Sequence, residues 1–134
     1  MKFKLLVFLF YIFTFSLSAQ NNRDKRDVFV PLSKYIEKGE VEKLSAWFAS
    51  TIELDIKGKL TQCSKFQAIK ILNLFFNEYT PKTFEIKYKS GRAPLKYAVG
   101  NLSAGGENFD VILYVRISKE GNKLQQLKIR RKNN

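Results

Sequence analysis

The chain has 134 residues, of which 45% are hydrophobic and 14% aromatic, and it carries a formal net charge of +12. This length and apolar content predict one folded domain and exclude an intrinsically disordered chain. The chain has no histidine and only one cysteine, Cys63. It therefore cannot form an intrachain disulfide, and it offers neither a histidine general base nor a cysteine–histidine metal site.

The N-terminus has the layout of a secretory signal peptide. Lys2 and Lys4 form a short basic start, Leu5–Phe13 is an unbroken apolar run, and small residues follow up to Ala19. The strongly apolar part is shorter than the roughly 20 residues of a membrane-spanning helix, so cleavage after Ser18 or Ala19 is favoured over an uncleaved anchor. No cysteine lies near the end of the apolar run, which excludes a bacterial lipid anchor on an N-terminal cysteine. We expect an exported protein, periplasmic or secreted.

The rest of the chain has no internal repeat, no low-complexity segment and no linker long enough to divide it. We expect a signal peptide over residues 1–19, a flexible polar lead over 20–26, a single domain over 27–131 and a basic tail over 132–134. The leader holds two of the lysines, so the mature domain keeps most of the positive charge.

Helical spacing predicts two helices at the start of the domain. The first begins at Val28 with Asp27 as its N-cap, has its apolar face at Val28, Phe29, Leu32, Tyr35 and Ile36, and ends after Lys38 at Gly39. The second runs from Glu40 to Ala49 and includes Trp47 in its apolar stripe.

The middle of the chain predicts one strand and one long helix. Thr51–Ile56 alternates between apolar and polar residues, as a half-buried strand does, and Lys57–Gln62 reads as the loop after it. Cys63 reads as a structural residue of this loop or of the helix start. A capping box of Ser64 and Gln67 opens an apolar helix that continues to Asn77, which we expect the other elements to wrap.

Four strands with short turns are predicted to follow. Their ranges are Thr83–Lys89, Leu95–Leu102, Phe109–Ile117 and Leu124–Arg130. The alternation of apolar residues predicts which side chains face the core and which face outward. By this reading the inner face includes Tyr88 and Tyr97, and the outer face includes Ala98, Gly100, Ile112, Tyr114 and Leu124.

This order of elements resembles the nuclear-transport-factor-2-like, or cystatin-like, fold over about Val28 to Arg130. The resemblance implies an α+β cone: helix–helix–strand–helix, then a four-stranded antiparallel meander curved around the long helix. More narrowly, the chain resembles domain-of-unknown-function family 4783, an uncharacterised Bacteroidota-type family of small exported proteins. The residues that carry this likeness are Gly39, Trp47-Phe48, Ser64-Lys65, Ala68, Phe75-Phe76, Tyr97–Gly100 and Leu127–Ile129. The family has no assigned function, so the resemblance implies fold and compartment only.

Some relatives with this fold are enzymes, such as steroid isomerases, epoxide hydrolases and dehydratases, which place acids or bases inside the cone. Here the strand acids Asp55, Glu85 and Asp110 fall on the outward parity, and only loop acids such as Glu107 remain open. We therefore keep a pocket enzyme of isomerase or hydrolase type as the alternative reading. No catalytic residue, metal site or cofactor is predicted.

The mouth of the cone is the first predicted binding surface. Trp47, Tyr88 and Tyr97 are candidates for lining a pocket for a small apolar ligand. The competing interpretation is a filled core whose tyrosine hydroxyls reach water at the rim.

The outer face of the sheet is the second predicted surface. Its interface candidates are Ala98, Gly100, Ile112, Tyr114 and Leu124. We expect a homodimer or an envelope protein to bind there, unless the helix pair or a terminus covers the face.

Basic residues gather near the C-terminus, at Lys128, Arg130, Arg131 and Lys132. An anionic membrane surface is a weak candidate partner for them, and a solvated, solubilising charge is the simpler interpretation. The tail has no interleaved aromatic residue, which makes nucleic acid an unlikely partner. The sequence thus favours a non-enzymatic binding or protein-interaction module of the bacterial cell envelope.

Overall fold

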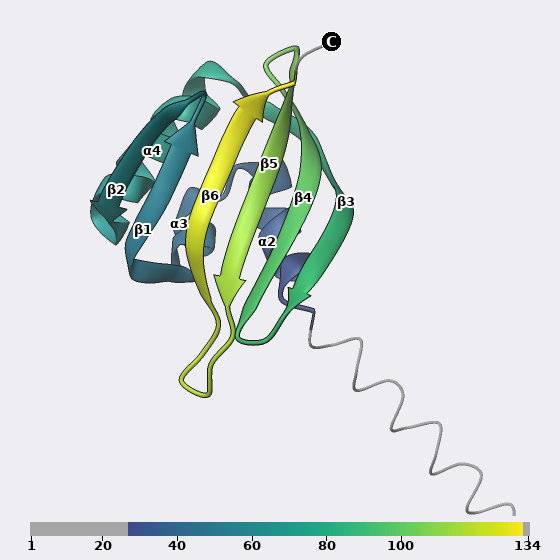
Figure 1. Ribbon diagram of the computed structural model, residues 1–134. Coiled ribbons are helices and arrows are strands. Elements are labelled where there is room, and N and C mark those ends of the chain that lie inside the picture. Colours follow the sequence, from purple (N-terminus) through teal and green to yellow (C-terminus); the bar gives the residue numbers. More distant parts are fainter. Residues whose placement is uncertain (1–26, 133–134) are drawn as a thin grey trace, which may run out of the picture.

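One curved sheet organises the protein, with its strands in the order β2-β1-β6-β5-β4-β3 (Figure 1). Neighbouring strands pair antiparallel, except that β1 runs parallel to β6. The strands are β1 (Phe48–Ile56), β2 (Lys59–Ser64), β3 (Pro81–Arg92), β4 (Leu95–Ala104), β5 (Glu107–Arg116) and β6 (Lys123–Arg131). The helices are α2 (Phe29–Lys38), α3 (Val41–Ser45) and α4 (Lys65–Glu78), and they lie together on one face of the sheet.

The computed structural model describes residues 27–132. The predicted signal peptide over 1–19, the predicted lead over 20–26 and the last two residues of the predicted tail lie outside this range. Within it, none of the helices has the length and apolar character needed to span a membrane.

The first helix begins and ends as predicted, to within a residue. The N-cap position is Val28, and the carboxylate of Asp27 accepts the backbone N–H of Phe29 at 3.0 Å. Gly39 ends α2 with a φ of 66°, a left-handed conformation that glycine adopts without strain.

The second helix is shorter than predicted. α3 ends at Ser45, and the carbonyl of Trp47 already accepts the N–H of Leu124 on β6 at 2.6 Å. Phe48 belongs to β1, where its fully buried ring anchors the strand in the core. Burial against the sheet therefore overrides the helical spacing in this stretch.

A strand occupies most of the segment that reads as a loop. Lys57 and Gly58 both have positive φ, 53° and 88°, and form a tight turn that joins β1 to β2 as a hairpin. Cys63 therefore lies in a strand rather than in a loop. Its thiol is buried and approaches the carbonyl of Ile52 at 3.7 Å, and this burial raises its pKa.

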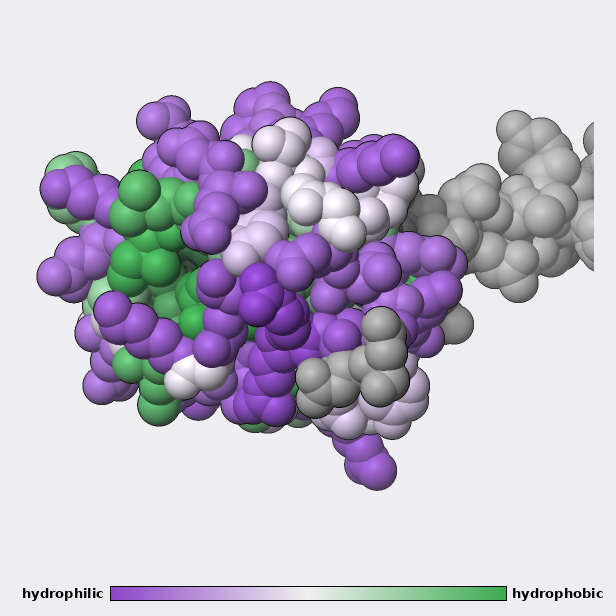
Figure 2. Space-filling model, turned by 90° about the horizontal axis from the view of Figure 1, so that it is seen from above, coloured by the Kyte–Doolittle hydropathy of each residue, from purple (hydrophilic) through white to green (hydrophobic). Residues whose placement is uncertain are grey.

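The long helix begins with the predicted capping box, in which Ser64 and Gln67 each bond the other's backbone N–H. The curved sheet and α3 cover one side of this helix, where Ala68, Leu72, Phe75 and Phe76 are buried, and its other side stays exposed. α4 packs mainly against α3, β1 and β2, its Phe75 ring also meets Phe109 of β5, and Phe66 and Leu74 are left 67% and 70% exposed. Figure 2 shows a hydrophobic area on the side of the molecule where α4 and β2 lie.

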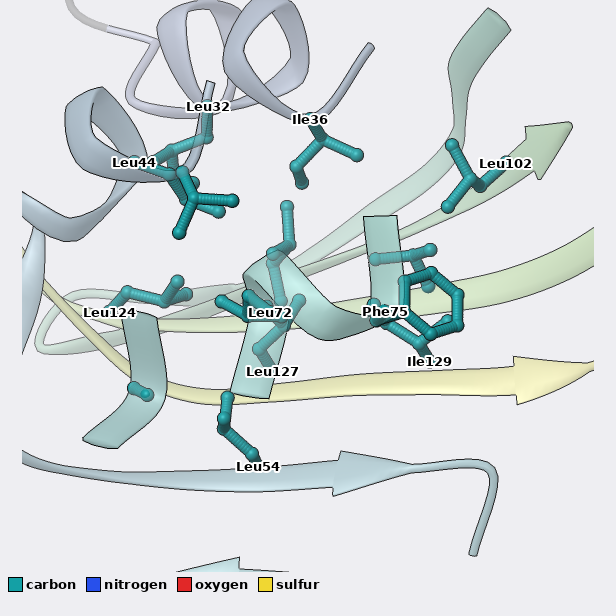
Figure 3. Packing of buried hydrophobic residues seen from close by; sticks show 14 of the residues in the cluster. Leu32, Ile36, Leu44, Leu54, Leu72, Phe75, Leu102, Leu124, Leu127 and Ile129 are labelled. Carbon is teal, nitrogen blue, oxygen red and sulfur yellow. The ribbon is translucent and has the colours of Figure 1, made fainter. Parts of the chain in front are cut away.

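Side chains from the helices and from the sheet fill the interior (Figure 3). Leu32, Leu44 and Leu72 of the helices meet Leu124 and Leu127 of β6, and each is at most 1% exposed. The inner face of β5 is the predicted one; it carries Phe109, Val111, Leu113 and Val115.

The facing of β4 is the reverse of the prediction. Ala98 pairs with Leu113 and Gly100 with Val111, so these small residues face the core. Tyr97 lies on the opposite parity and faces outward, as does Val99. Alternation misleads here because both faces of β4 carry apolar residues, and the small inner ones make room for the ring of Phe84, which would lie 2.6 Å from a Cβ at position 100.

Register shifts in two further strands, β3 and β6, also reverse the predicted facing of side chains. The register of β3 shifts between Ile86 and Tyr88, so Ile86 faces inward and Tyr88 faces outward. The register of β6 shifts by one residue between the partners of Tyr114 and Val115, and this turns Leu124 into the core. One extra residue in a strand exchanges its two faces, and the extra residue leaves no mark in an apolar pattern.

The facing of β4 predicts the effect of adding a methyl group at position 100. Gly100→Ala drives a Cβ into the Phe84 ring and to 2.8 Å from the Glu85 carbonyl oxygen. Urea unfolding is expected to show a loss of about 1–3 kcal/mol in the free energy of unfolding. Ser103→Ala, on the outer face of the same strand, is the control and should change it by no more than about 0.5 kcal/mol. Equal stability of the two variants would contradict the inward facing of Gly100.

The hydrogen bonds of Asp27 at the start of α2 predict that this residue contributes to folding stability in a pH-dependent way. Burial alone would raise the pKa of Asp27, but its hydrogen bonds from the Lys89 ammonium, at 2.6 Å, and from the Phe29 N–H lower it overall. The stabilisation is therefore complete above the unfolded pKa of 3.8 and is lost as the pH falls through the lower folded value.

Asp27→Ala removes both the capping acceptor and the ion pair, and should lower the free energy of unfolding by about 1 kcal/mol at neutral pH. Asp27→Asn keeps an acceptor and should cost less, because both side chains of the pair are partly exposed. Urea titrations across the acid range should show the gap between wild type and Asp27→Asn closing. A gap that stays constant down to about pH 2 would contradict the assignment.

Candidate functional site

The outer face of the sheet has no described helix over it (Figure 1). It carries three neighbouring tyrosine rings. Tyr97 on β4 pairs in register with Tyr114 on β5, and their ring centres lie 5.6 Å apart. Tyr88 on β3 lies 6.0 Å from Tyr97. The inward facing of Ala98 and the register shift after Ile86 together place these rings outside.

Two aliphatic side chains continue the same surface. Val99 and Ile112 pair in register on β4 and β5, and Val99 also pairs with Tyr88. We call these residues the tyrosine patch: Tyr88, Tyr97, Val99, Ile112 and Tyr114. Tyr88 is 55% exposed and the others are half-buried, so the patch meets solvent without any charged side chain among its members.

A polar row extends the patch across the remaining strands. Tyr114 pairs with Gln126 on β6, Gln126 with Glu53 on β1, and Glu53 with Gln62 on β2. The Gln126 amide donates to the Glu53 carboxylate at 2.7 Å, which links the side chains of β6 and β1. These residues and Arg116 line a groove of about 600 Å³.

Charges of both signs surround the patch. Arg116 and Lys128 lie near it on the outer face, and so do the acids Glu53 and Asp110. Hydrogen bonds with the side chains of Ser90 and Tyr97 lower the pKa of the Tyr88 hydroxyl.

Asp55, the predicted outward acid of β1, is the one buried charged residue in the range 27–132. Its carboxylate accepts the N–H of Gly58 at 3.1 Å and lies 3.6 Å from the Arg130 guanidinium. The buried charge is thus paired on the outer face and does not enter the interior of the cone.

Of the predicted pocket residues, only Trp47 lies at the mouth. It lines an open groove of about 400 Å³ with Pro31, Lys96 and Ile117. Tyr88 and Tyr97 do not join it, because they lie on the outer face.

Of the predicted interface residues, Ile112 and Tyr114 lie on the outer face. Ala98, Gly100 and Leu124 face the core, for the reasons of parity and register given above. The outer face instead presents Tyr88, Tyr97 and Val99. The residue type could have indicated this facing. Phe84 and Phe109, which face inward, have no hydroxyl, whereas the hydroxyl of a tyrosine needs a hydrogen-bond partner when it is buried.

Within residues 27–132 no carboxylate is buried on the inner face, and the buried polar groups there include the Cys63 thiol and the Tyr79 hydroxyl. No group of three or more metal-ligating residues gathers there. The open candidate Glu107 lies at the start of β5 and forms an ion pair with Arg131 at 3.0 Å. The interior is therefore a packed core with no positioned acid or base.

Comparison with known proteins identifies a family that this chain matches. The family model "Domain of unknown function (DUF4783)" matches residues 29–130. Among curated proteins, none matches this chain.

Solved structures agree with this fold. A DUF4783 family protein from Bacteroides uniformis is 19% identical, with a TM-score of 0.75 over 81% of this chain and 100% of that one. One from Bacteroides ovatus is also 19% identical, with a TM-score of 0.74 over 78% and 96%. A putative dehydratase of the NTF2-like family from Streptomyces avermitilis is 12% identical, with a TM-score of 0.59 over 78% and 90%. At these identities the likeness concerns the fold alone. With the family model spanning most of its length, the chain belongs to the DUF4783 family and has an NTF2-like, cystatin-like α+β fold.

Proposed function

We propose that this protein is an exported, non-enzymatic protein-interaction module of the bacterial cell envelope that binds through the outer face of its sheet. The observation that carries the proposal is the tyrosine patch, an aromatic surface of adjoining strands with no described element over it. Tyrosine is enriched in the centres of protein interfaces, where its ring is buried and its hydroxyl keeps a partner.

The surroundings of the patch match the anatomy of an interface. Uncharged side chains occupy its centre, and the polar row with Gln126 and Glu53 lies at one side. Rings that already rest on the sheet lose little conformational freedom on binding, so contact with them is not offset by a large entropy cost.

The occupant that we assign is a second copy of this chain. The outer face carries acids such as Glu53 and Asp110 as well as bases such as Arg116 and Lys128. A face of mixed sign can meet its own copy without the repulsion that the positive net charge of the mature chain would otherwise impose.

The alternatives have weaker support. An isomerase or hydrolase needs a positioned acid or base in a cavity, and the described interior is filled by apolar side chains. A small apolar ligand could contact the groove at Trp47, but that groove is open and the other two candidate rings lie elsewhere.

The proposal predicts a dimer that depends on the tyrosine patch. Sedimentation velocity should show a concentration-dependent dimer for the mature wild type. The double variant Tyr88→Ser/Tyr97→Ser should weaken dimerisation at least about tenfold, since buried interface tyrosines commonly contribute more than about 1 kcal/mol each.

Phe66→Ser is the control, because it removes an exposed aromatic ring from α4, away from the outer face. It should leave the dimer unchanged. A wild type that stays monomeric at its highest soluble concentration overturns the assigned occupant. Equal weakening by the control would show that general apolar exposure, and not the patch, drives association.

The export part of the proposal has its own test. The intact mass of protein recovered from the envelope fraction of its own cells should correspond to a chain starting after Ser18 or Ala19. A full-length mass in the cytoplasmic fraction would contradict it.

A further inference from the structure

Two positive charges converge on one phenol oxygen at the end of the sheet where β1 and β6 finish. The Lys57 ammonium lies 3.1 Å from the Tyr79 hydroxyl oxygen, and the Arg131 guanidinium lies 2.9 Å from it. The Tyr79 ring is only 7% exposed and packs 5.1 Å from the rings of both Phe75 and Phe109. The core therefore fixes the oxygen on which the cations meet.

Lys57 reaches this position at a conformational cost. It is the only non-glycine residue with positive φ in residues 27–132. Asparagine or glycine would suit the first position of this two-residue turn better. The Lys57 N–H donates to the Ile129 carbonyl at 2.8 Å, which ties the turn to β6 and aims the side chain at Tyr79. A backbone outlier that presents a charge to a fixed partner points to a function at that place.

The positive charge here exceeds the negative charge. Glu107 pairs with Arg131, and Asp55 with Arg130. Within the described range, no carboxylate lies within ion-pair distance of Lys57 or of Lys132, whose ammonium contacts the Asn101 amide oxygen at 3.3 Å. Figure 2 looks down on this end and shows a largely hydrophilic surface there.

The donors at this place point to an acceptor of negative charge. The Tyr79 oxygen accepts from two cations, so its own O–H is left as a donor, and Lys57 keeps further N–H groups. Two like charges on one oxygen repel each other. An oxyanion placed between them would accept from all three groups and offset the repulsion.

We propose that Lys57, Tyr79 and Arg131 form a binding site for a phosphate group. Arginine and lysine together are common phosphate ligands, the first by its planar fork and the second as a point charge. The site lies outside the tyrosine patch, at the end of the sheet where β1 and β6 finish. Phosphate could reach it as a free ion or as part of a lipid headgroup, since the chemistry is the same.

The test uses the mature chain and inorganic phosphate, followed by NMR at ionic strength held constant with chloride. Wild type should show saturable shifts of the amides around Lys57, Tyr79 and Arg131. Lys57→Asn should weaken phosphate binding about fivefold or more. Asparagine suits a left-handed turn residue, so this variant should melt at or above the wild-type temperature, and lost binding cannot then be attributed to unfolding.

Two further variants sharpen the result. Tyr79→Phe keeps the buried ring and removes only the hydroxyl, and it should also weaken binding. Lys119→Asn makes the same charge change in the exposed loop at the opposite end of the sheet, and it should bind phosphate like wild type. Equal titrations for wild type, Lys57→Asn and Lys119→Asn, or shifts that never saturate, would overturn the site.

A second arm identifies the source of the phosphate. Vesicles of phosphatidylglycerol are compared with vesicles of phosphatidylcholine for wild type and Lys57→Asn. A loss of phosphatidylglycerol binding in the variant supports the site with a lipid headgroup as its source. Site-specific binding of inorganic phosphate with equal vesicle binding by both proteins supports it with a soluble phosphate.

Discussion

The ring of Phe84 lies over Gly100, and this contact determines which side chains of β4 face the core and which face outward. Since side chains alternate along a strand, the small inner residue at position 100 fixes Ala98 and Leu102 as inward and Tyr97 as outward. The aromatic bulk that fills the core beside β4 comes from neighbouring elements, while the aromatic ring of β4 itself is directed to solvent. The uncovered aromatic surface thus follows from a close approach in the interior.

Register shifts in the pairings of β3 and β6 then change which side chains of these two strands face the core and which face solvent. On β3, the shift after Ile86 lets one strand bury Phe84 at one end and expose Tyr88 at the other. On β6, the extra residue brings Leu124 into the core opposite Val115, while Gln126 remains outward beside Tyr114. Without these shifts the tyrosine patch would lose Tyr88, and the core would lose Leu124.

The sequence predicts the parts of the fold that local chemistry determines. The capping box of Ser64 and Gln67, the glycine end of α2 and the inward residues of β5 depend on neighbours in the chain or on a clean alternation. The hairpin strand β2 escapes prediction because it is an edge strand of mostly exposed residues, with Cys63 as its one buried side chain.

The facing of β4 escapes prediction for a different reason. An alternating pattern assigns a strand only when one of its faces is polar, and β4 carries Tyr97 and Val99 on one face against Ala98 and Leu102 on the other. The size of the side chains determines the facing of β4 instead. Rings on other elements, such as Phe84, leave room only for small residues on its inner face. Ile112 and Tyr114 could be placed because β5 has a fully apolar inner face, whereas Tyr88 depends on a register shift that no residue type signals.

The two proposed surfaces meet at one residue, Asp55. Its carboxylate lies on the outer face beside Arg130, and it also accepts the N–H of Gly58 in the turn that presents Lys57. A buried acid held in this way is stable because both of its oxygens have partners, one of them a cation and the other a backbone N–H. The same side chain therefore orders the outer face and fixes the turn of the cationic end, so the geometry of the phosphate site depends on a residue of the interaction face.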